Sequence, residues 1–174
     1  MKQFIIISTF LLFSIKGFST VQQPDYLIFN KDTLYFNDLP NFISSPLEQI
    51  DSISHYIKKL IADLSGIETI NSGCWRGFYA EWKIIDNQLY LSKVFDCETH
   101  EVINKIVVKV LGRRFVNGLL KADWVNGSFG CGKDLVDHFY LPVYRHNWKL
   151  LIENGIIINK IENNLTDNVD DGHL

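Results

Sequence analysis

The stretch GCWRGFYAEWKIIDNQLYL, residues 73–91, indicates how the chain folds. From Phe78–Ile85 every second residue is apolar, while Glu81 and Lys83 occupy alternate positions, which predicts a strand with one face in a core. Trp82 lies on the apolar face, and we expect its ring to be buried. The turn residues 86–88 then lead into a second predicted strand, 89–95, so the stretch predicts a hairpin.

Two amphipathic helices are predicted on either side of this hairpin. Ser45 is a capping residue, Pro46 suits the first helical position, and Glu48 follows the cap by three residues. Apolar residues then recur at helical spacing over residues 46–64. The same spacing recurs over residues 99–111, followed by a glycine that is typical of a helix end.

Further hairpins complete the fold expected from the sequence. Residues 25–36 contain two apolar runs around a polar turn. Asn126-Gly127 and Asn154-Gly155 are type I′ hairpin signals between apolar runs. The sequence therefore predicts an α+β domain, with an antiparallel sheet built from hairpins and two amphipathic helices.

The N-terminus resembles an export signal. A short basic start precedes an apolar run at residues 4–15, and small residues precede a cleavage point after Ser19. We therefore predict a signal peptide at residues 1–19, a single domain at 20–162, and a flexible acidic tail at 163–174. The expected location is the periplasm or the exterior of the cell.

Charge and cysteine content restrict the possible partners. The 174-residue chain has a net charge of −3, and loss of the lysines at positions 2 and 16 brings it to −3 − 2 = −5. This charge argues against nucleic acid as a partner. Cys74, Cys97 and Cys131 allow one disulfide with a spare thiol, or three free thiols. None is spaced as C-x-x-C, so no zinc site is predicted.

The segment GSFGCGK, residues 127–133, resembles part of a phosphate-binding loop. However, Asp134 stands where a serine or threonine should bind magnesium, and its carboxylate would repel phosphate. We interpret the segment as a glycine-rich hairpin turn. No cofactor is predicted.

Five residues are candidates for binding. Arg76 and Asp123 are expected to form a partly buried ion pair that links two strands. Trp75, Trp124 and Tyr79 are alternatively expected to line a surface that stacks on sugar rings or on a protein partner. The structural interpretation is favoured over the binding interpretation for these residues.

An enzymatic alternative rests on Asp137, His138 and His146. Such a cluster could bind a metal or perform acid–base chemistry if its members converge in space. No H-E-x-x-H pattern or other helical metal spacing is present. Histidines on the surface, or satisfied by neighbours, are the favoured interpretation, so no metal site is assigned.

Three motifs resemble those of a known group of proteins. Residues 75–82 fit W-R-G-[YF]-x-x-x-W, L-Y-L follows at 89–91, and A-D-W-x-x-G spans 122–127. This pattern resembles an uncharacterised family of small exported proteins of Bacteroidetes type. The resemblance covers most of the chain after the signal peptide and implies export, but no activity and no cofactor.

The leading hypothesis from the sequence is an exported, non-enzymatic domain that binds a protein or a glycan. One form of it is an immunity or accessory protein, because a small acidic protein suits a basic partner. The alternative is a small periplasmic hydrolase or metal-dependent enzyme. Convergence of the histidine cluster would favour the enzyme, and exposure of Trp75 or Trp124 would favour binding.

Overall fold

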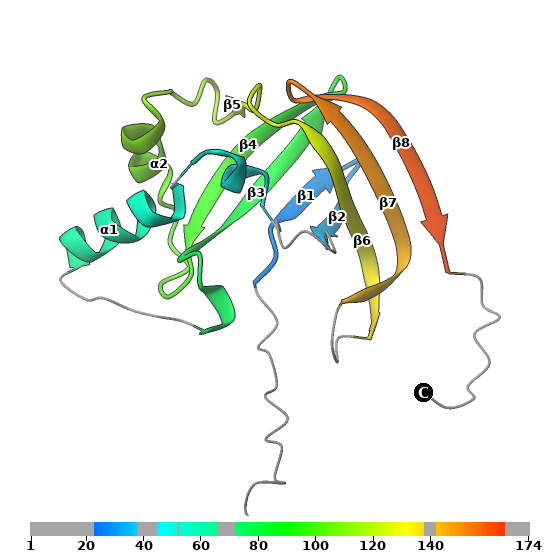
Figure 1. Cartoon of the computed structure of the whole chain (residues 1–174), viewed down its shortest axis with the longest axis horizontal. Helices are drawn as coiled ribbons and strands as arrows, with labels where there is room; N and C mark the ends of the chain where they lie inside the picture. The colour runs from blue at the N-terminus through cyan, green and yellow to red at the C-terminus, as the bar shows by residue number, and fades with distance from the viewer. Residues whose placement is uncertain (1–22, 38–44, 52, 66–71, 138–141, 166–174) are drawn as a thin grey trace, which may run out of the picture.

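The fold is a mixed α+β arrangement of one sheet and two helices (Figure 1). The computed structural model describes residues 23–37, 45–51, 53–65, 72–137 and 142–165. Within these ranges no helix has the length and apolar character needed to cross a bilayer. The predicted signal peptide lies outside the described residues.

The eight strands form a single curled sheet whose ends meet. The strands are β1 (Tyr26–Phe29), β2 (Asp32–Phe36), β3 (Phe78–Ile85), β4 (Gln88–Asp96), β5 (Leu120–Lys121), β6 (Gly127–Asp137), β7 (Val143–Glu153) and β8 (Ile156–Asn164). Their order is β3-β1-β2-β6-β7-β8-β4-β5, and β3 also pairs with β4. All strands except β5 therefore form a closed ring, visible as the curl on the right of Figure 1.

The sheet is mixed, so the prediction of a purely antiparallel sheet is wrong. β1 runs parallel to β3, with Tyr26 opposite Glu81 and Ile28 opposite Lys83. All the other strand pairs of the described sheet are antiparallel. A parallel pair requires a long crossover, and here the connection contains β2 and the first helix.

Three of the predicted hairpins are confirmed. β1–β2, β3–β4 and β7–β8 are antiparallel pairs, each joined by a two-residue turn. Both residues of every turn have positive φ, as type I′ geometry requires: Asn30 and Lys31, Asp86 and Asn87, Asn154 and Gly155. A Cβ on Gly155 would lie 2.4 Å from the carbonyl oxygen of Ala122, so this turn also needs glycine for space.

The predicted hairpin at Asn126-Gly127 is wrong. β5 pairs with β4 and not with β6. Asn126 instead makes tertiary contacts: its backbone N–H donates to Gln49 Oε1 at 2.8 Å, and its Oδ1 accepts from the backbone of Asn154 at 2.8 Å. The local turn signal is overridden because the asparagine bridges two other segments.

The glycine-rich segment at 127–133 is also not a turn. It is the first part of β6, and Phe129 and Cys131 belong to the core. Gly132 faces the ring of Tyr144, where a Cβ would lie 2.6 Å from side-chain atoms. This glycine therefore makes room for an aromatic ring, and the segment has no phosphate-loop geometry.

The first predicted helix is interrupted. Pro46–Gln49 forms the 3-10 helix η2, capped by Ser45, and Ile50 is extended. The α-helix α1 begins only at Ile53 and covers Ile53–Ser65. The second, α2, covers Asn104–Leu111 and ends at Gly112 in the left-handed conformation, as predicted. It begins later than expected because Asp96 Oδ1 holds the preceding turn through backbone N–H groups.

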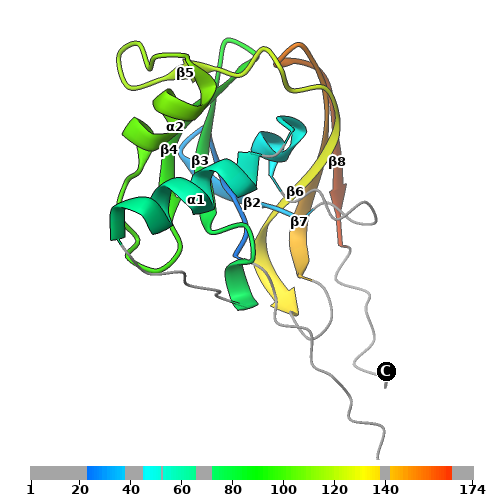
Figure 2. The ribbon, with the colours of Figure 1, turned by 60° about the vertical axis from the view of Figure 1, so that its left-hand side comes forward.

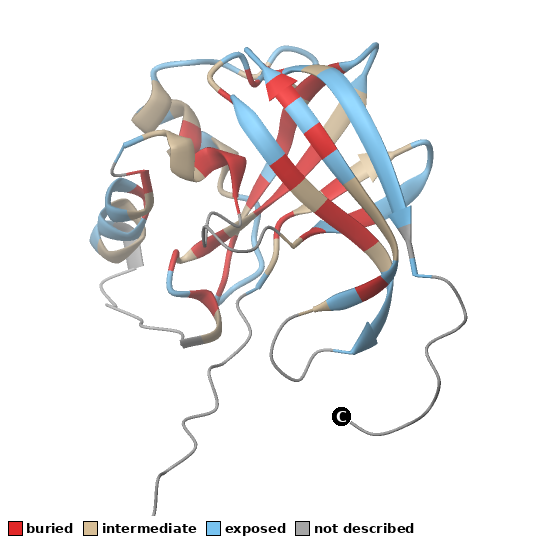
Figure 3. Cartoon of the chain, turned by 45° about the vertical axis from the view of Figure 1, so that its right-hand side comes forward, coloured by how far each residue is buried: buried red, intermediate tan, exposed pale blue. Residues whose placement is uncertain are grey.

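The core lies inside the curled sheet and beneath the helices (Figures 2 and 3). Trp82 is fully buried, which confirms its predicted position. Ile57 of α1 and Val107 of α2 are also fully buried, and each belongs to the same apolar cluster as Trp82. The two helices therefore pack on the sheet side that carries the β3 core residues.

Candidate functional site

Arg76 lies at the centre of a buried polar cluster. Its side chain has no exposed surface. Nη1 lies 3.3 Å from Asp25 Oδ1 and 3.6 Å from Glu48 Oε2, and Nη2 donates to the carbonyl of Gln23 at 2.6 Å. The guanidinium thus joins the start of β1, the η2 segment and the approach to β3.

The predicted ion pair between Arg76 and Asp123 is wrong. Asp123 is exposed and pairs with Arg113, which follows α2. It lies in the connection between β5 and β6, on the surface. A fully buried guanidinium requires counter-charges that are themselves close to buried, and Asp25 supplies one.

Asp25 is fully buried, and its carboxylate accepts three hydrogen bonds. Oδ2 accepts from Ser45 Oγ at 2.6 Å and from the indole N–H of Trp82 at 2.8 Å. Oδ1 accepts from the backbone N–H of Ala80 at 3.0 Å. Burial raises the pKa of Asp25, while Arg76 and these donors act against the rise. The contacts attach the start of β1 to β3.

Glu48 is the second acid of this cluster. Burial raises the pKa of Glu48, Arg76 opposes the rise, and the charge of Asp25 adds to it. Its Oε2 accepts no hydrogen bond within the described residues, and neither Nε nor Nη1 of Arg76 donates one there. The cluster has two carboxyl groups for one guanidinium and offers no surface to a macromolecular partner, which gives Arg76 a structural role.

The two candidate tryptophans differ in exposure. Trp124 packs against the core and donates its indole N–H to the carbonyl of Pro46 at 3.3 Å. Trp75 is 47 % exposed, with the ammonium of Lys58 lying 5.6 Å from its ring centroid. Of these two rings, Trp75 alone presents a large area to a partner.

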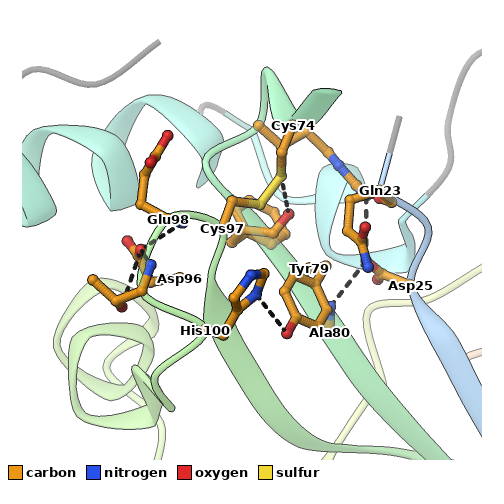
Figure 4. Close-up of a disulfide and its surroundings, with 12 residues drawn as sticks. Gln23, Asp25, Cys74, Tyr79, Ala80, Asp96, Cys97, Glu98 and His100 are labelled. Atoms are coloured by element: carbon orange, nitrogen blue, oxygen red, sulfur yellow. Dashed lines mark hydrogen bonds and ion pairs between the residues drawn. A yellow bond between two sulfur atoms is a disulfide. The ribbon is translucent and has the colours of Figure 1, made fainter. Parts of the chain in front are cut away.

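Tyr79 belongs to an aromatic stack on the outer face of the sheet. Its ring stacks on Phe95 with centroids 4.9 Å apart, and its hydroxyl lies 3.2 Å from His100 Nδ1 (Figure 4). Tyr26 of β1 joins the stack, with its ring 6.3 Å from Phe95. These contacts bind β1, β3 and β4 together, so Tyr79 is half-buried by its neighbours.

Glu81 lies beside this stack and is nearly buried. It accepts hydrogen bonds from Ser92 and from the hydroxyl of Tyr26 and pairs with Lys93 and Lys83. Burial acts to raise the pKa of Glu81, but the Ser92 hydroxyl and the two lysines outweigh it and leave the pKa below its usual value. Unlike the Arg76 cluster, this cluster has more cations than acids.

Cys74 and Cys97 form a disulfide, which resolves the pairing left open by the sequence (Figure 4). The bond attaches η3 (Ser72–Cys74) to the end of β4, close to Arg76. Cys131 takes no part in the disulfide and is buried in β6. Its expected place in a turn is therefore wrong, and burial makes it a poor nucleophile.

The proposed catalytic cluster is only partly described. His138 lies outside the described residues. Asp137 is opposite Val143, whereas His146 is opposite Lys133, four positions along β6. His146 Nε2 instead lies 3.6 Å from Asp134. No group of three or more potential metal ligands occurs among the residues that the structure describes.

The outer edge of β8 was not predicted from the sequence. β8 pairs with β7 along its length but with β4 only at Ile156, opposite Gln88. The last bond to the β4 side is from the N–H of Ile157 to the carbonyl of Asn87, at 2.8 Å. Beyond Ile157, no described strand pairs with this side of β8, which leaves an open edge (Figures 1 and 3).

Apolar side chains are concentrated around this open edge. Ile156, Ile158 and Ile161 of β8 are 47 %, 47 % and 48 % exposed, and Leu151 of β7 is 40 % exposed. Leu150 and Ile152 are buried, so Leu151 faces outward. Of the fourteen exposed large hydrophobic residues among the described part of the chain, these three isoleucines and Leu151 are four, and Leu165 directly follows β8. The hairpin signal indicated strands here, but not that the second would lie at an edge.

No family model matches the chain, and neither a curated protein nor a solved structure matches it. The resemblance based on the W-R-G and A-D-W motifs therefore stays a prediction. The function must be argued from the geometry of this chain alone.

Proposed function

We propose that the chain is an exported protein that binds an extended segment of another protein along the open edge of β8. The bound segment would add a strand beside residues 158–164. The observation that carries this proposal is the separation of β8 from β4 after Ile157, next to exposed isoleucines. Backbone hydrogen bonds then provide affinity, and the apolar side chains provide selectivity.

The limited protection of the β8 edge supports the proposal. Soluble proteins usually protect long edges with charges, prolines or bulges. β8 contains no proline, and its lysine, Lys160, does not extend along the edge. Its ammonium lies 4.3 Å from the ring centroid of Phe29 and 5.3 Å from that of Trp148. Of these protective features, β8 has a bulge at Ile158, since Leu151 pairs with Asn159 and Ile152 with Ile157.

The chemistry of the edge selects the type of partner. The exposed side chains are aliphatic, so the added strand should carry aliphatic or aromatic residues at alternate positions. A sugar would instead require aromatic platforms with polar neighbours, and no aromatic residue occurs in β8. A protein segment is therefore favoured over a glycan at this edge.

The disulfide supports the export part of the proposal. Disulfides persist in oxidising compartments and are uncommon in the cytosol. The bond between Cys74 and Cys97 is compatible with the predicted signal peptide at residues 1–19. Mass determination of the protein secreted from its host would test this: cleavage near Ser19 is expected, and an intact N-terminus in the cytosol would contradict export.

Peptide selection tests the binding surface. Peptides selected from a random library against the folded chain should shift the backbone amide signals of residues 158–164 in NMR spectra. Ile161→Lys should abolish their binding, because it places a charge among the exposed aliphatic side chains of the β8 edge. Ile85→Lys is the matched control, because Ile85 is 42 % exposed but lies at the end of β3.

Three outcomes would contradict the proposal. The selected peptides could perturb other strands or the helices, or Ile85→Lys could weaken binding as much as Ile161→Lys. Sedimentation of the chain alone gives the third: a concentration-dependent dimer lost in Ile161→Lys would make a second copy the occupant of the edge.

A further inference from the structure

A groove between the two helices is a second candidate site, distant in sequence from β8. It has a volume of about 380 Å³ and lies where α1 and α2 meet. Figure 2 shows the two helices next to each other in front of the sheet. Its lining comprises Tyr56, Lys59, Leu60 and Asp63 of α1 with Lys109 and Val110 of α2. The α1 residues share one helix face, because they are three or four positions apart.

The two lysines of the groove form no ion pair with any described residue, although Asp63 also contributes to the lining. Lys59 comes from α1 and Lys109 from α2, and among the described residues neither ammonium forms an ion pair or hydrogen bond. By contrast, Lys83 and Lys93 on the sheet both pair with Glu81. Two cations facing one groove without partners repel each other, so the groove favours an anion.

The remaining lining residues limit what kind of anion fits. Asp63 reduces the formal charge of the lining to +1, which matches a single negative charge. Leu60 and Val110 are half-buried and supply apolar surface, and the ring of Tyr56 is 53 % exposed. The volume is within the lower range for small-molecule sites, about 300–1,000 Å³.

We propose that this groove binds a small monocarboxylate with a short apolar body. The carboxylate lies between the ammonium groups of Lys59 and Lys109, and the apolar part covers Leu60 and Val110. The Tyr56 hydroxyl can donate a further hydrogen bond to the carboxylate. This site does not depend on the β8 edge, so each can fail without the other.

NMR titration with hexanoate tests the site, with hexan-1-ol as the neutral probe of the same chain length. Hexanoate is expected to shift the amides of residues 56–63 and 109–110, and hexan-1-ol to bind more weakly. Lys59→Ala and Lys109→Ala should each weaken hexanoate binding about two- to fivefold, as expected for an exposed ion pair. Lys105→Ala is the matched control, since Lys105 is exposed on α2 but does not line the groove.

Asp63→Asn gives an effect of opposite sign. Removing this negative charge should strengthen hexanoate binding about two- to fivefold and leave hexan-1-ol binding unchanged. The proposal is overturned if hexanoate shifts no groove amide, if hexan-1-ol binds equally well, or if Lys105→Ala matches the groove variants. Weaker hexanoate binding by Asp63→Asn would also overturn it, because the carboxylate would then not be the recognised group.

Discussion

The β3–β4 and β7–β8 hairpins have the same type of turn but opposite surroundings. β3 and β4 each have strands on both sides. Glu81 of β3 is nearly buried and forms an ion pair with Lys93 of β4. β8 has a neighbour on both sides only at its start, and its residues Ile156, Ile158 and Ile161 are exposed. One hairpin buries charge, and the other exposes apolar surface. The β3–β4 hairpin thus maintains the fold, whereas β8 carries the edge that we propose binds a partner.

The largest effect on this comparison is expected at Arg76. Arg76→Met leaves the Asp25 carboxylate buried without its cation, which should lower the free energy of unfolding by about 3–5 kcal/mol. Urea denaturation followed by tryptophan fluorescence measures the loss. Adding Asp25→Asn should recover part of it, because the uncompensated charge is then absent. A loss below about 1 kcal/mol in Arg76→Met would contradict the buried cluster.

The second largest loss of stability is expected from removing the disulfide. Cys74→Ala with Cys97→Ala opens a loop with a sequence separation of 23 and should cost about 2–4 kcal/mol. Reduced wild-type protein serves as the control and should unfold at the same urea concentration as the double variant. Unchanged stability in both would show that packing alone maintains η3 against β4.

Glu81 gives a smaller effect that depends on pH. Because its pKa is lowered in the folded state, its stabilisation is complete above the unfolded value of 4.5 and is lost as pH falls through the folded value. Glu81→Gln should cost about 1–3 kcal/mol at neutral pH, from the weakened hydrogen bond with Ser92. Lys83 and Lys93 add little, because both are more than a third exposed.

Measurements of the free energy of unfolding at neutral pH and below about pH 4 test this dependence on the charge of Glu81. The difference between wild type and Glu81→Gln should shrink in acid. A difference that grows in acid would mean that Glu81 is protonated more readily in the folded chain than in the unfolded chain.

The smallest effect on stability is expected at the β8 edge. Ile161→Lys should change the free energy of unfolding by no more than about 0.5 kcal/mol, because the side chain is 48 % exposed. The same substitution at Ile152, which is fully buried on β7, should be severely destabilising. Similar losses of unfolding free energy at both positions would indicate that Ile161 is part of the core and does not lie at a binding edge.

Local signals in the sequence were sufficient for the hairpins and for the helix end at Gly112. Asn154-Gly155 predicted its turn because both residues readily adopt positive φ. Asn126-Gly127 carries the same signal, yet Asn126 contacts Gln49 and Asn154 instead. A dipeptide preference of this kind is small and is overridden by tertiary contacts.

The candidate site was less predictable, because its properties depend on distant partners. Arg76 was identified as one member of a buried pair, but the sequence does not show that Asp25 would be closer to it than Asp123. The parallel pairing of β1 with β3 brings Asp25 there. Equally, the apolar pattern of β8 predicted a strand, whereas an edge position depends on where β4 separates from it.

The position of Asp25 also affects the order in which the chain can fold as it leaves the ribosome. β1 can pair with β2 as soon as that hairpin emerges, but Arg76, Ala80 and Trp82 are synthesised much later. Until then the Asp25 carboxylate stays hydrated, and its strand lacks one neighbour. The first described strand to be made is therefore among the last to acquire all its contacts, because its parallel neighbour β3 and the partners of Asp25 follow much later in the chain.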